Sequence, residues 1–265
     1  MKTLTSKDNA QIKNILKLQK SAKFRRQSGC FIAEGLRVCV DAVLSGAEIK
    51  ALFITDEAIE KNADAYNTLS SHSDETYVLS SALFDYISDT QAPQGILCVV
   101  KQFHYDLKDL TRGESPLCVV LENLQDPGNL GTIFRTAEGA GVSGILLSRD
   151  SVDLYNPKVI RSTMGSVYRM PFYYTDNLHA VLRDWKEQGI ALYAAHLKGN
   201  HTYDHEDYRK SSAFLIGNES QGLTEETASL ANHYIRIPMS GQVESLNAAV
   251  AAAILMYEAR RQKGT

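Results

Sequence analysis

The sequence has few features of a secreted or membrane protein. Its four cysteines, Cys30, Cys39, Cys98 and Cys118, are widely spaced, and no pair has C-x-x-C spacing. Three of them lie beside valines, so we expect buried thiols of a reducing compartment rather than disulfides or metal ligands. The longest nearly apolar run, AAVAAAILMY from Ala248, is far shorter than the roughly 20 residues that a membrane-spanning helix needs. The chain also begins without an apolar signal segment, so we expect a cytoplasmic protein with no membrane partner.

Two nucleotide-binding signatures are also missing. Residues 217 to 224 read GNESQGLT, which resembles the phosphate-binding pattern G-x-x-x-x-G-K-[ST], but Leu223 stands in place of the lysine. Glu219 puts a carboxylate where a polyphosphate would lie. The glycine-rich stretch NLQDPGNLGTIFRTAEGAGV contains G-x-x-G, which is not the dinucleotide fingerprint G-x-G-x-x-G. These absences favour a ligand without phosphate groups.

Charge is distributed unevenly along the chain. Residues 1 to 50 contain ten Lys and Arg against four Asp and Glu, a net charge of +6, while the remainder has 18 against 27, a net charge of −9. A basic segment joined to an acidic body indicates an anionic partner, most commonly nucleic acid. The alternative is a solvated helix face, and charge alone does not decide between them. The predicted RNA contacts are Lys13, Lys17, Lys20, Arg25 and Arg26.

The first hundred residues predict a small α/β unit. Apolar positions from Ile12 to Ala22 recur with helical spacing, which predicts a helix over residues 6–27. Short strands follow at CFIAEG, ALFIT, TYVLS and GILCVV, with a helix predicted over residues 36–44. The polar stretch HYDLKDLTRGESP reads as a linker. We therefore predict two domains, residues 1–105 and 106–265.

The second domain predicts a mostly parallel sheet. Six apolar runs, LCVVLE, GILLS, FYYT, IALYAA, AFLIG and YIRIP, alternate with helical stretches. This spacing is typical of a parallel α/β sheet with helices on both faces. Ligands of such sheets bind beyond the carboxyl ends of the strands. Three segments at such ends contain glycines, amides and hydroxyls: NLQDPGNLGTIFRTAEGAGV, NESQGL and MSGQVESLNAAVAAAILMYEA.

These three segments resemble, in order and spacing, the three motifs of the SpoU-class (TrmH-like) RNA ribose 2′-O-methyltransferases of the SPOUT superfamily. The resemblance covers residues 116–262, and the N-terminal part resembles the small substrate-binding domain that such enzymes often have. It implies a deep trefoil knot, S-adenosylmethionine as cofactor, no metal, and a homodimer. It also implies an RNA substrate, which we expect to be ribosomal rather than transfer RNA.

Site residues follow from the resemblance by matching position. Gly217, Ile237 and Leu246 are implied in cofactor binding, mainly through their main chains. Asn129, Arg135, Glu219, Ser245 and Asn247 are implied in catalysis. We interpret Arg135 as a group that orients a phosphate and the reacting hydroxyl and stabilises negative charge, because a guanidinium is a poor base.

Each of these residues also has a structural alternative. Arg135 could pair with Glu138 on one helix face, Asn129 and Ser245 could be helix N-caps, and Glu219 could be an exposed loop carboxylate. Their joint occurrence in three motifs favours function. Two rival functions also remain, a non-catalytic RNA-binding assembly factor and an RNA base methyltransferase.

A group of histidines could be mistaken for a metal site. His196, His201 and His205 lie near Asp204 in the segment HLKGNHTYDHED, and two of the histidines are four residues apart. Glycine and turn-forming residues around them argue against a rigid helix. We expect this loop to be a wall of the cofactor pocket instead.

Overall fold

The computed structural model describes residues 1–196, 199 and 201–264, which form two compact units. The first unit contains residues 1–103 and 153–169, and the second contains residues 104–152 and 170–265. The chain first passes between them close to the predicted boundary at residue 105. No described helix is both long enough and apolar enough to span a membrane.

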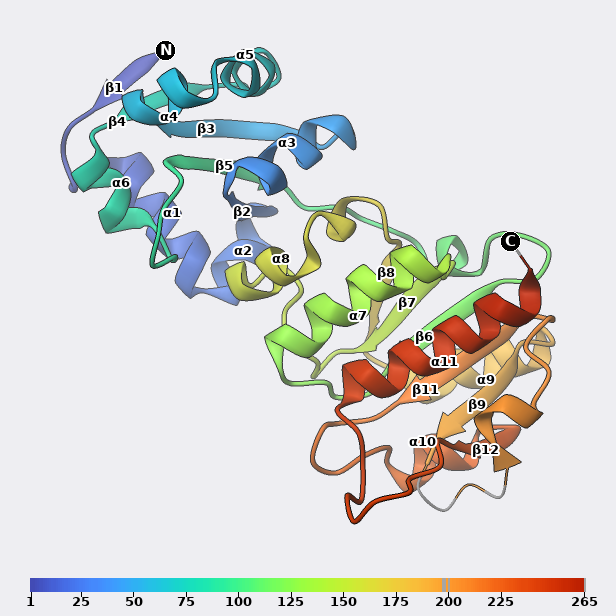
Figure 1. Ribbon diagram of the computed structural model, residues 1–265. Coiled ribbons are helices and arrows are strands. Elements are labelled where there is room, and N and C mark those ends of the chain that lie inside the picture. Colours follow the sequence, from blue (N-terminus) through green and yellow to red (C-terminus); the bar gives the residue numbers. More distant parts are fainter. Residues whose placement is uncertain (197–198, 200, 265) are drawn as a thin grey trace. The chain divides into compact units, whose positions relative to one another are not determined.

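The described residues of the first unit form a mixed sheet of five strands in the order β1-β4-β3-β5-β2 (Figure 1). Strands β1, β4 and β3 are parallel, whereas β5 is antiparallel to both β3 and β2. The strands are β1 Lys2–Leu4, β2 Cys30–Glu34, β3 Ile49–Thr55, β4 Thr76–Leu79 and β5 Ile96–Lys101. The helices are α1 Ala10–Lys20, α2 Ala22–Ser28, α3 Leu36–Leu44, α4 Asp56–Lys61, α5 Ala63–Ser71 and α6 Ser81–Ile87.

The predicted helix over residues 6–27 is two helices. Ser21 has extended backbone angles (φ −125°, ψ 108°), and it ends α1 and begins α2. Its hydroxyl accepts a hydrogen bond from the Phe24 backbone N at 3.1 Å. Serine competes in this way for backbone donors at helix starts, so the apolar periodicity alone concealed the break. The predicted inward face is confirmed, since Ile12, Ile15 and Leu18 are buried.

Residues 153–169 belong to the first unit, although they follow the predicted boundary by some fifty residues. This segment contains helix α8, Pro157–Thr163, and a short 3₁₀ helix, Ser166–Tyr168. Helix α8 packs on β2, and the Tyr155 ring lies 4.7 Å from that of Phe31. Apolar side chains of the segment are buried there, which a boundary drawn at a polar linker could not predict.

The second unit has a parallel sheet, as predicted. Its described residues form seven strands in the order β10-β12-β9-β11-β6-β7-β8, and all paired neighbours are parallel. The strands are β6 Leu117–Leu121, β7 Gly144–Ser148, β8 Phe172–Thr175, β9 Ala191–Ala195, β10 His201–Thr202, β11 Ser212–Ile216 and β12 His233–Arg236. The six predicted runs coincide with six of these strands.

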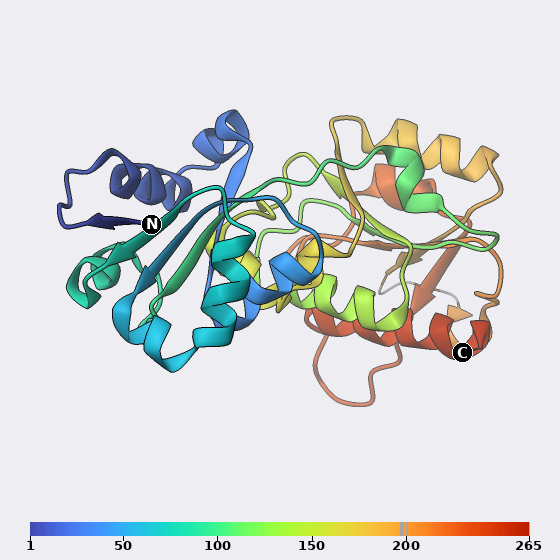
Figure 2. The ribbon, with the colours of Figure 1, turned by 90° about the horizontal axis from the view of Figure 1, so that it is seen from above.

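Helices cover both faces of this sheet, as predicted (Figure 2). Helices α7, Pro127–Ala140, and α11, Ala248–Lys263, lie side by side on one face. Helix α9, Leu178–Glu187, covers the other face with Leu182 and Trp185, and α10, Glu225–Ser229, packs beside it. The central strand β11 and its neighbour β6 therefore lie between two helical layers.

The predicted linker is partly structured. A 3₁₀ helix, Leu107–Thr111, lies within it and packs on β6, β7 and β8. Leu110 is fully buried, and a Cβ atom on Gly144 would lie 2.6 Å from the Leu110 Cα. One leucine in a polar stretch thus anchors this segment to the sheet, where a glycine leaves room for it.

Candidate functional site

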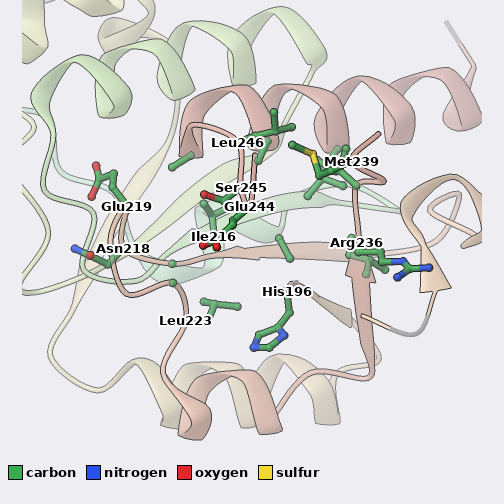
Figure 3. Close-up of a pocket in the computed structure, with 18 of the residues that line it drawn as sticks. His196, Ile216, Asn218, Glu219, Leu223, Arg236, Met239, Glu244, Ser245 and Leu246 are labelled. Atoms are coloured by element: carbon green, nitrogen blue, oxygen red, sulfur yellow. The ribbon is translucent and has the colours of Figure 1, made fainter. Parts of the chain in front are cut away.

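A cavity of about 700 Å³ lies beyond the carboxyl ends of β9, β11 and β12 (Figure 3). This is the edge at which parallel sheets bind ligands. Three loops form its walls: the 217–224 loop after β11, residues 235–239 at the end of β12, and residues 243–246 before α11. The predicted cofactor residues Gly217, Ile237 and Leu246 come from these three loops, and all of them line the cavity.

The 217–224 loop closes tightly on itself. Asn218 and Gly222 exchange two backbone hydrogen bonds of 3.0 and 2.9 Å. A Cβ atom on Gly217 would lie 2.0 Å from the Gly222 carbonyl carbon and 2.1 Å from the Leu223 N, closer than atoms can pack. Glycine at 217 is therefore required for the loop to close.

Glu219 connects this loop to the start of α7. One carboxylate oxygen accepts hydrogen bonds from the Asp126 backbone N at 2.8 Å and the Asn129 side chain at 3.0 Å. The other accepts from the Gln125 backbone N at 3.1 Å. Asn247 in turn donates to Asn129 Oδ1 at 2.8 Å. The structure thus links Asn129, Glu219 and Asn247, one predicted residue from each of the three motifs.

These hydrogen bonds set the ionisation of Glu219. Burial alone would raise its pKa, but the bonds from Asp126, Asn129 and Gln125 together outweigh burial and lower it. A carboxylate with a lowered pKa and both oxygens engaged is a weak proton acceptor. The arrangement suits Glu219 to holding loops together. The residue is an exposed loop carboxylate, as the alternative had it, but both of its oxygens accept hydrogen bonds.

The two capping alternatives are wrong as stated. The N-cap of α7 is Asp126, whose side chain accepts from the Asn129 backbone N, so the amide group of Asn129 remains available for Glu219 and Asn247. The N-cap of α11 is Asn247, which accepts from the backbone N atoms of Ala249 and Val250. Ser245 lies two residues earlier and lines the cavity.

Arg135 stands apart from the cavity of its own chain. It lies on α7 two turns beyond Asn129, is exposed, and is not among the residues that line the cavity. Within the described part of the chain its guanidinium forms no ion pair, so the predicted alternative of a pair with Glu138 is not formed. An exposed cation of this kind can receive a phosphate without first breaking a contact.

The predicted RNA contacts of the first unit do not share one environment. Lys13, Lys17, Lys20 and Arg26 are exposed. Arg25 is only 3% exposed, donates to the Leu18 and Gln19 carbonyl oxygens at 2.6 and 2.9 Å, and lies 2.7 Å from the Asp153 carboxylate. Arg25 therefore cannot be the phosphate contact that the sequence predicted. Its donors cap the last turn of α1 and pair with a partly buried carboxylate.

The histidines form no described metal site. Among the described residues, no three or more His, Cys, Asp or Glu side chains are placed to hold a metal ion. Of the loop predicted to be a pocket wall, His196 lines the cavity, whereas none of residues 201–207 does, and His201 lies 3.3 Å from Glu206. Residues 197, 198 and 200, which belong to the predicted pocket wall, are not among the residues that the structure describes.

Five polar residues of the cavity wall were not identified from the sequence: Asn218, Ser220, Gln221, Arg236 and Glu244. Figure 3 shows three of them, Asn218, Arg236 and Glu244, on the three loops that form the wall. Each of these three is next to a residue that was identified, namely Gly217, Ile237 and Ser245. Their position one residue from a motif residue was the available signal.

Two known families match the chain. Residues 116–257 match the SpoU rRNA Methylase family, and residues 9–98 match the MRM3-like substrate binding domain. The first match covers the second unit's cavity loops, helix α7 and the first ten residues of α11. The second covers most of the strands and helices of the first unit.

Similar proteins span almost the whole chain. The 23S rRNA (guanosine(2553)-2′-O)-methyltransferase RlmP of Bacillus subtilis is 31% identical over 98% of this chain and 100% of its own length. An AdoMet-bound rRNA methyltransferase from Sinorhizobium meliloti has a TM-score of 0.86 at 33% identity, covering 98% of this chain and 97% of its own. The SpoU methyltransferase AviRb from Streptomyces viridochromogenes, in complex with AdoMet, has a TM-score of 0.87 at 27% identity, covering 96% and 98%.

Proposed function

This chain belongs to the SpoU rRNA methylase family, and on that premise we propose that it transfers the methyl group of S-adenosylmethionine to a ribose 2′-oxygen of ribosomal RNA. The observation that carries the proposal is the cavity that brings Gly217, Ile237 and Leu246 together from three loops. The trefoil knot implied by the resemblance stays a prediction.

The cavity is chemically suited to S-adenosylmethionine. This cofactor has no phosphate, and when bound it supplies an electrophilic methyl group on a sulfonium ion. The 217–224 loop lacks the lysine that would repel a sulfonium, and Leu223 lines the cavity in its place. Backbone groups of Gly217, Ile237 and Leu246 hold the cofactor in our proposal, so the side chains at 237 and 246 matter for packing.

The remaining motif residues divide into two roles. Asn129, Glu219 and Asn247 hold the three motif loops in register through a chain of hydrogen bonds. Ser245 lines the cavity, and in our proposal it contacts the reacting groups. Arg135 binds the phosphate beside the target ribose and stabilises the negative charge that develops on the attacking oxygen.

Cofactor preference tests this proposal. The protein should bind S-adenosylmethionine and its demethylated product and should not bind ATP, because the loop has no phosphate-binding lysine and contains Glu219. Isothermal titration calorimetry with the three ligands measures this directly. Tight ATP binding without any S-adenosylmethionine binding would refute the proposed function.

We propose that the first unit binds RNA through the exposed basic side of α1 and α2. Lys13, Lys17 and Lys20 point away from the buried Ile12, Ile15 and Leu18. Lys13 makes only an exposed ion pair with Asp8, at 3.0 Å, and such pairs contribute little to stability. The cost of exchanging that partner for an RNA phosphate is therefore small.

Replacing Lys13, Lys17 and Lys20 together by alanine should weaken RNA binding. The slope of log K against log salt should become shallower by roughly 0.7 to 0.9 per lost phosphate contact. S-adenosylmethionine affinity should not change. A matched control replaces Lys50, Lys61 and Lys101, lysines of the same unit that pair with acidic neighbours; Lys61 and Lys101 are exposed and Lys50 is partly exposed. Equal salt slopes for the two triple variants would mean that only the total charge matters.

We further propose a cytoplasmic homodimer. Two large apolar side chains of α11, Val250 and Tyr257, are 48% and 53% exposed, and they lie two turns apart on the helix that flanks α7. Exposed apolar residues on one helix favour an interface between subunits. Arg135 lies outside the cavity of its own chain, which is compatible with a site completed by assembly.

A further inference from the structure

Glu122 is a buried carboxylate that none of the three motif roles uses. It directly follows β6 and is only 7% exposed. Among the described residues it has no cationic partner within ion-pair distance. A buried carboxylate must instead be satisfied by hydrogen-bond donors, and their identity shows what it holds.

All the described side-chain hydrogen bonds of Glu122 go to residues at the end of the 217–224 loop and just beyond it. One oxygen accepts from the Thr224 backbone N at 2.8 Å. The other accepts from the Thr224 hydroxyl, also at 2.8 Å, and from the Thr227 hydroxyl. The Thr227 hydroxyl proton is thus used, and its oxygen is 2.9 Å from His179 Nε2.

Glu122 also contacts the beginning of the same loop. Its backbone N donates to the Ile216 carbonyl oxygen at 2.9 Å, and Ile216 precedes Gly217. One residue therefore holds both ends of the 217–224 loop, the first end through its main chain and the second through its side chain. Between these two ends lie Gly217 and Leu223, which line the cavity.

We propose that Glu122 is a positioning residue that holds the 217–224 loop in the shape that binds S-adenosylmethionine. This inference rests on the proposed function, since it assigns the loop to that cofactor. Glu122 does not itself line the cavity, so it acts through Thr224 and Leu223. Without its carboxylate, the Thr224 N and two hydroxyls lose their acceptor, and the closing end of the loop is released.

Glu122→Ala should raise the dissociation constant of S-adenosylmethionine by about 30-fold or more, because the loop must then be ordered by the ligand. Glu122→Gln retains an amide oxygen for the Thr224 N and should raise it by less than about fivefold. At saturating cofactor, single-turnover methyl transfer should remain within about threefold of wild type for both variants, because the bound cofactor restores the loop.

Glu34 provides a matched control in the first unit. It too is 7% exposed, is the last residue of the buried strand β2, and accepts from Ser88, Asp89 and Thr90 of a loop. Glu34→Ala should lower the melting temperature by a similar amount and leave cofactor affinity within about twofold. If Glu34→Ala and Glu122→Ala weaken the cofactor equally, or if neither does, Glu122 has no positioning role.

Two further measurements keep the outcome decisive. If Glu122→Ala does not fold, Thr227→Val can be tested in its place. This variant removes the hydrogen bond from the Thr227 hydroxyl to Glu122 and should raise the dissociation constant of S-adenosylmethionine by about threefold. Unchanged affinity for both Thr227→Val and Glu122→Gln would overturn the inference. If wild-type protein itself does not bind S-adenosylmethionine, the proposed function fails. If wild type binds and folded Glu122→Ala binds equally well, only the positioning role fails.

Discussion

Replacing Arg135 by alanine will lower methyl transfer by a factor on the order of 10² to 10³, while S-adenosylmethionine affinity stays within a few-fold of wild type. The affinity is expected to hold because Arg135 lies outside the cavity that Gly217, Ile237 and Leu246 line. The rate is expected to fall because the variant lacks the guanidinium that, in our proposal, binds the phosphate and stabilises the attacking hydroxyl oxygen. This guanidinium is exposed and has no ion pair in the described structure. Single-turnover methyl transfer under saturating RNA measures the rate.

Arg183→Ala is a suitable control for this variant. Arg183 is an exposed arginine of α9, on the opposite face of the same sheet, so its loss changes the net charge equally. It should leave both turnover and thermal stability unchanged within error, because isolated exposed charges contribute little. Normal turnover in Arg135→Ala would show that Arg135 has no catalytic role, and the catalytic roles that the resemblance implies for Asn129 and Ser245 would lose most of their support.

Gly217→Ala should have the second large effect, on cofactor binding rather than on rate. An alanine Cβ would lie 2.0 Å from the Gly222 carbonyl carbon. Because the Gly222 carbon is a backbone atom that cannot rotate away, the 217–224 loop must open. Overpacking of this kind typically costs about 1–3 kcal/mol, and the strain falls on the loop that lines the cavity. We therefore expect the S-adenosylmethionine dissociation constant to rise by on the order of 100-fold.

The matched control is Gly241→Ala, in the chain segment before α11. A Cβ atom there has open space, and its backbone conformation is one that alanine adopts freely. Calorimetry should show unchanged cofactor affinity for Gly241→Ala and much weaker binding for Gly217→Ala. Wild-type affinity in Gly217→Ala would show that the 217–224 loop does not shape the cofactor site.

Local patterns predicted the elements of the fold well, because apolar runs and their spacing report burial. The six strands of the second unit and the helix over residues 36–44 were found in this way. The break at Ser21 and the burial of Leu110 were missed, since each depends on a single residue within a longer pattern. The packing of residues 153–169 with the first unit depends on contacts far apart in sequence.

The site was predicted in outline through the three motifs, and its connections were not. Gly217, Ile237, Ser245 and Leu246 line one cavity, as motif order and the parallel sheet implied. The hydrogen bond between Asn129 and Asn247 joins residues 118 positions apart, and the spacing of the motifs does not predict it. Arg25 shows the opposite error, because a charge count treats a buried cation and an exposed one alike.

The central claim is methyl transfer to a ribose 2′-oxygen, and the chemistry of the target nucleotide tests it most directly. Radiolabelled S-adenosylmethionine would be incubated with the protein and a ribosomal RNA fragment that accepts methyl groups. A second fragment would differ only by 2′-deoxyribose at the methylated nucleotide. Transfer to the first fragment and none to the second is the predicted result. Undiminished transfer to the deoxyribose fragment would contradict the account and indicate a base methyltransferase.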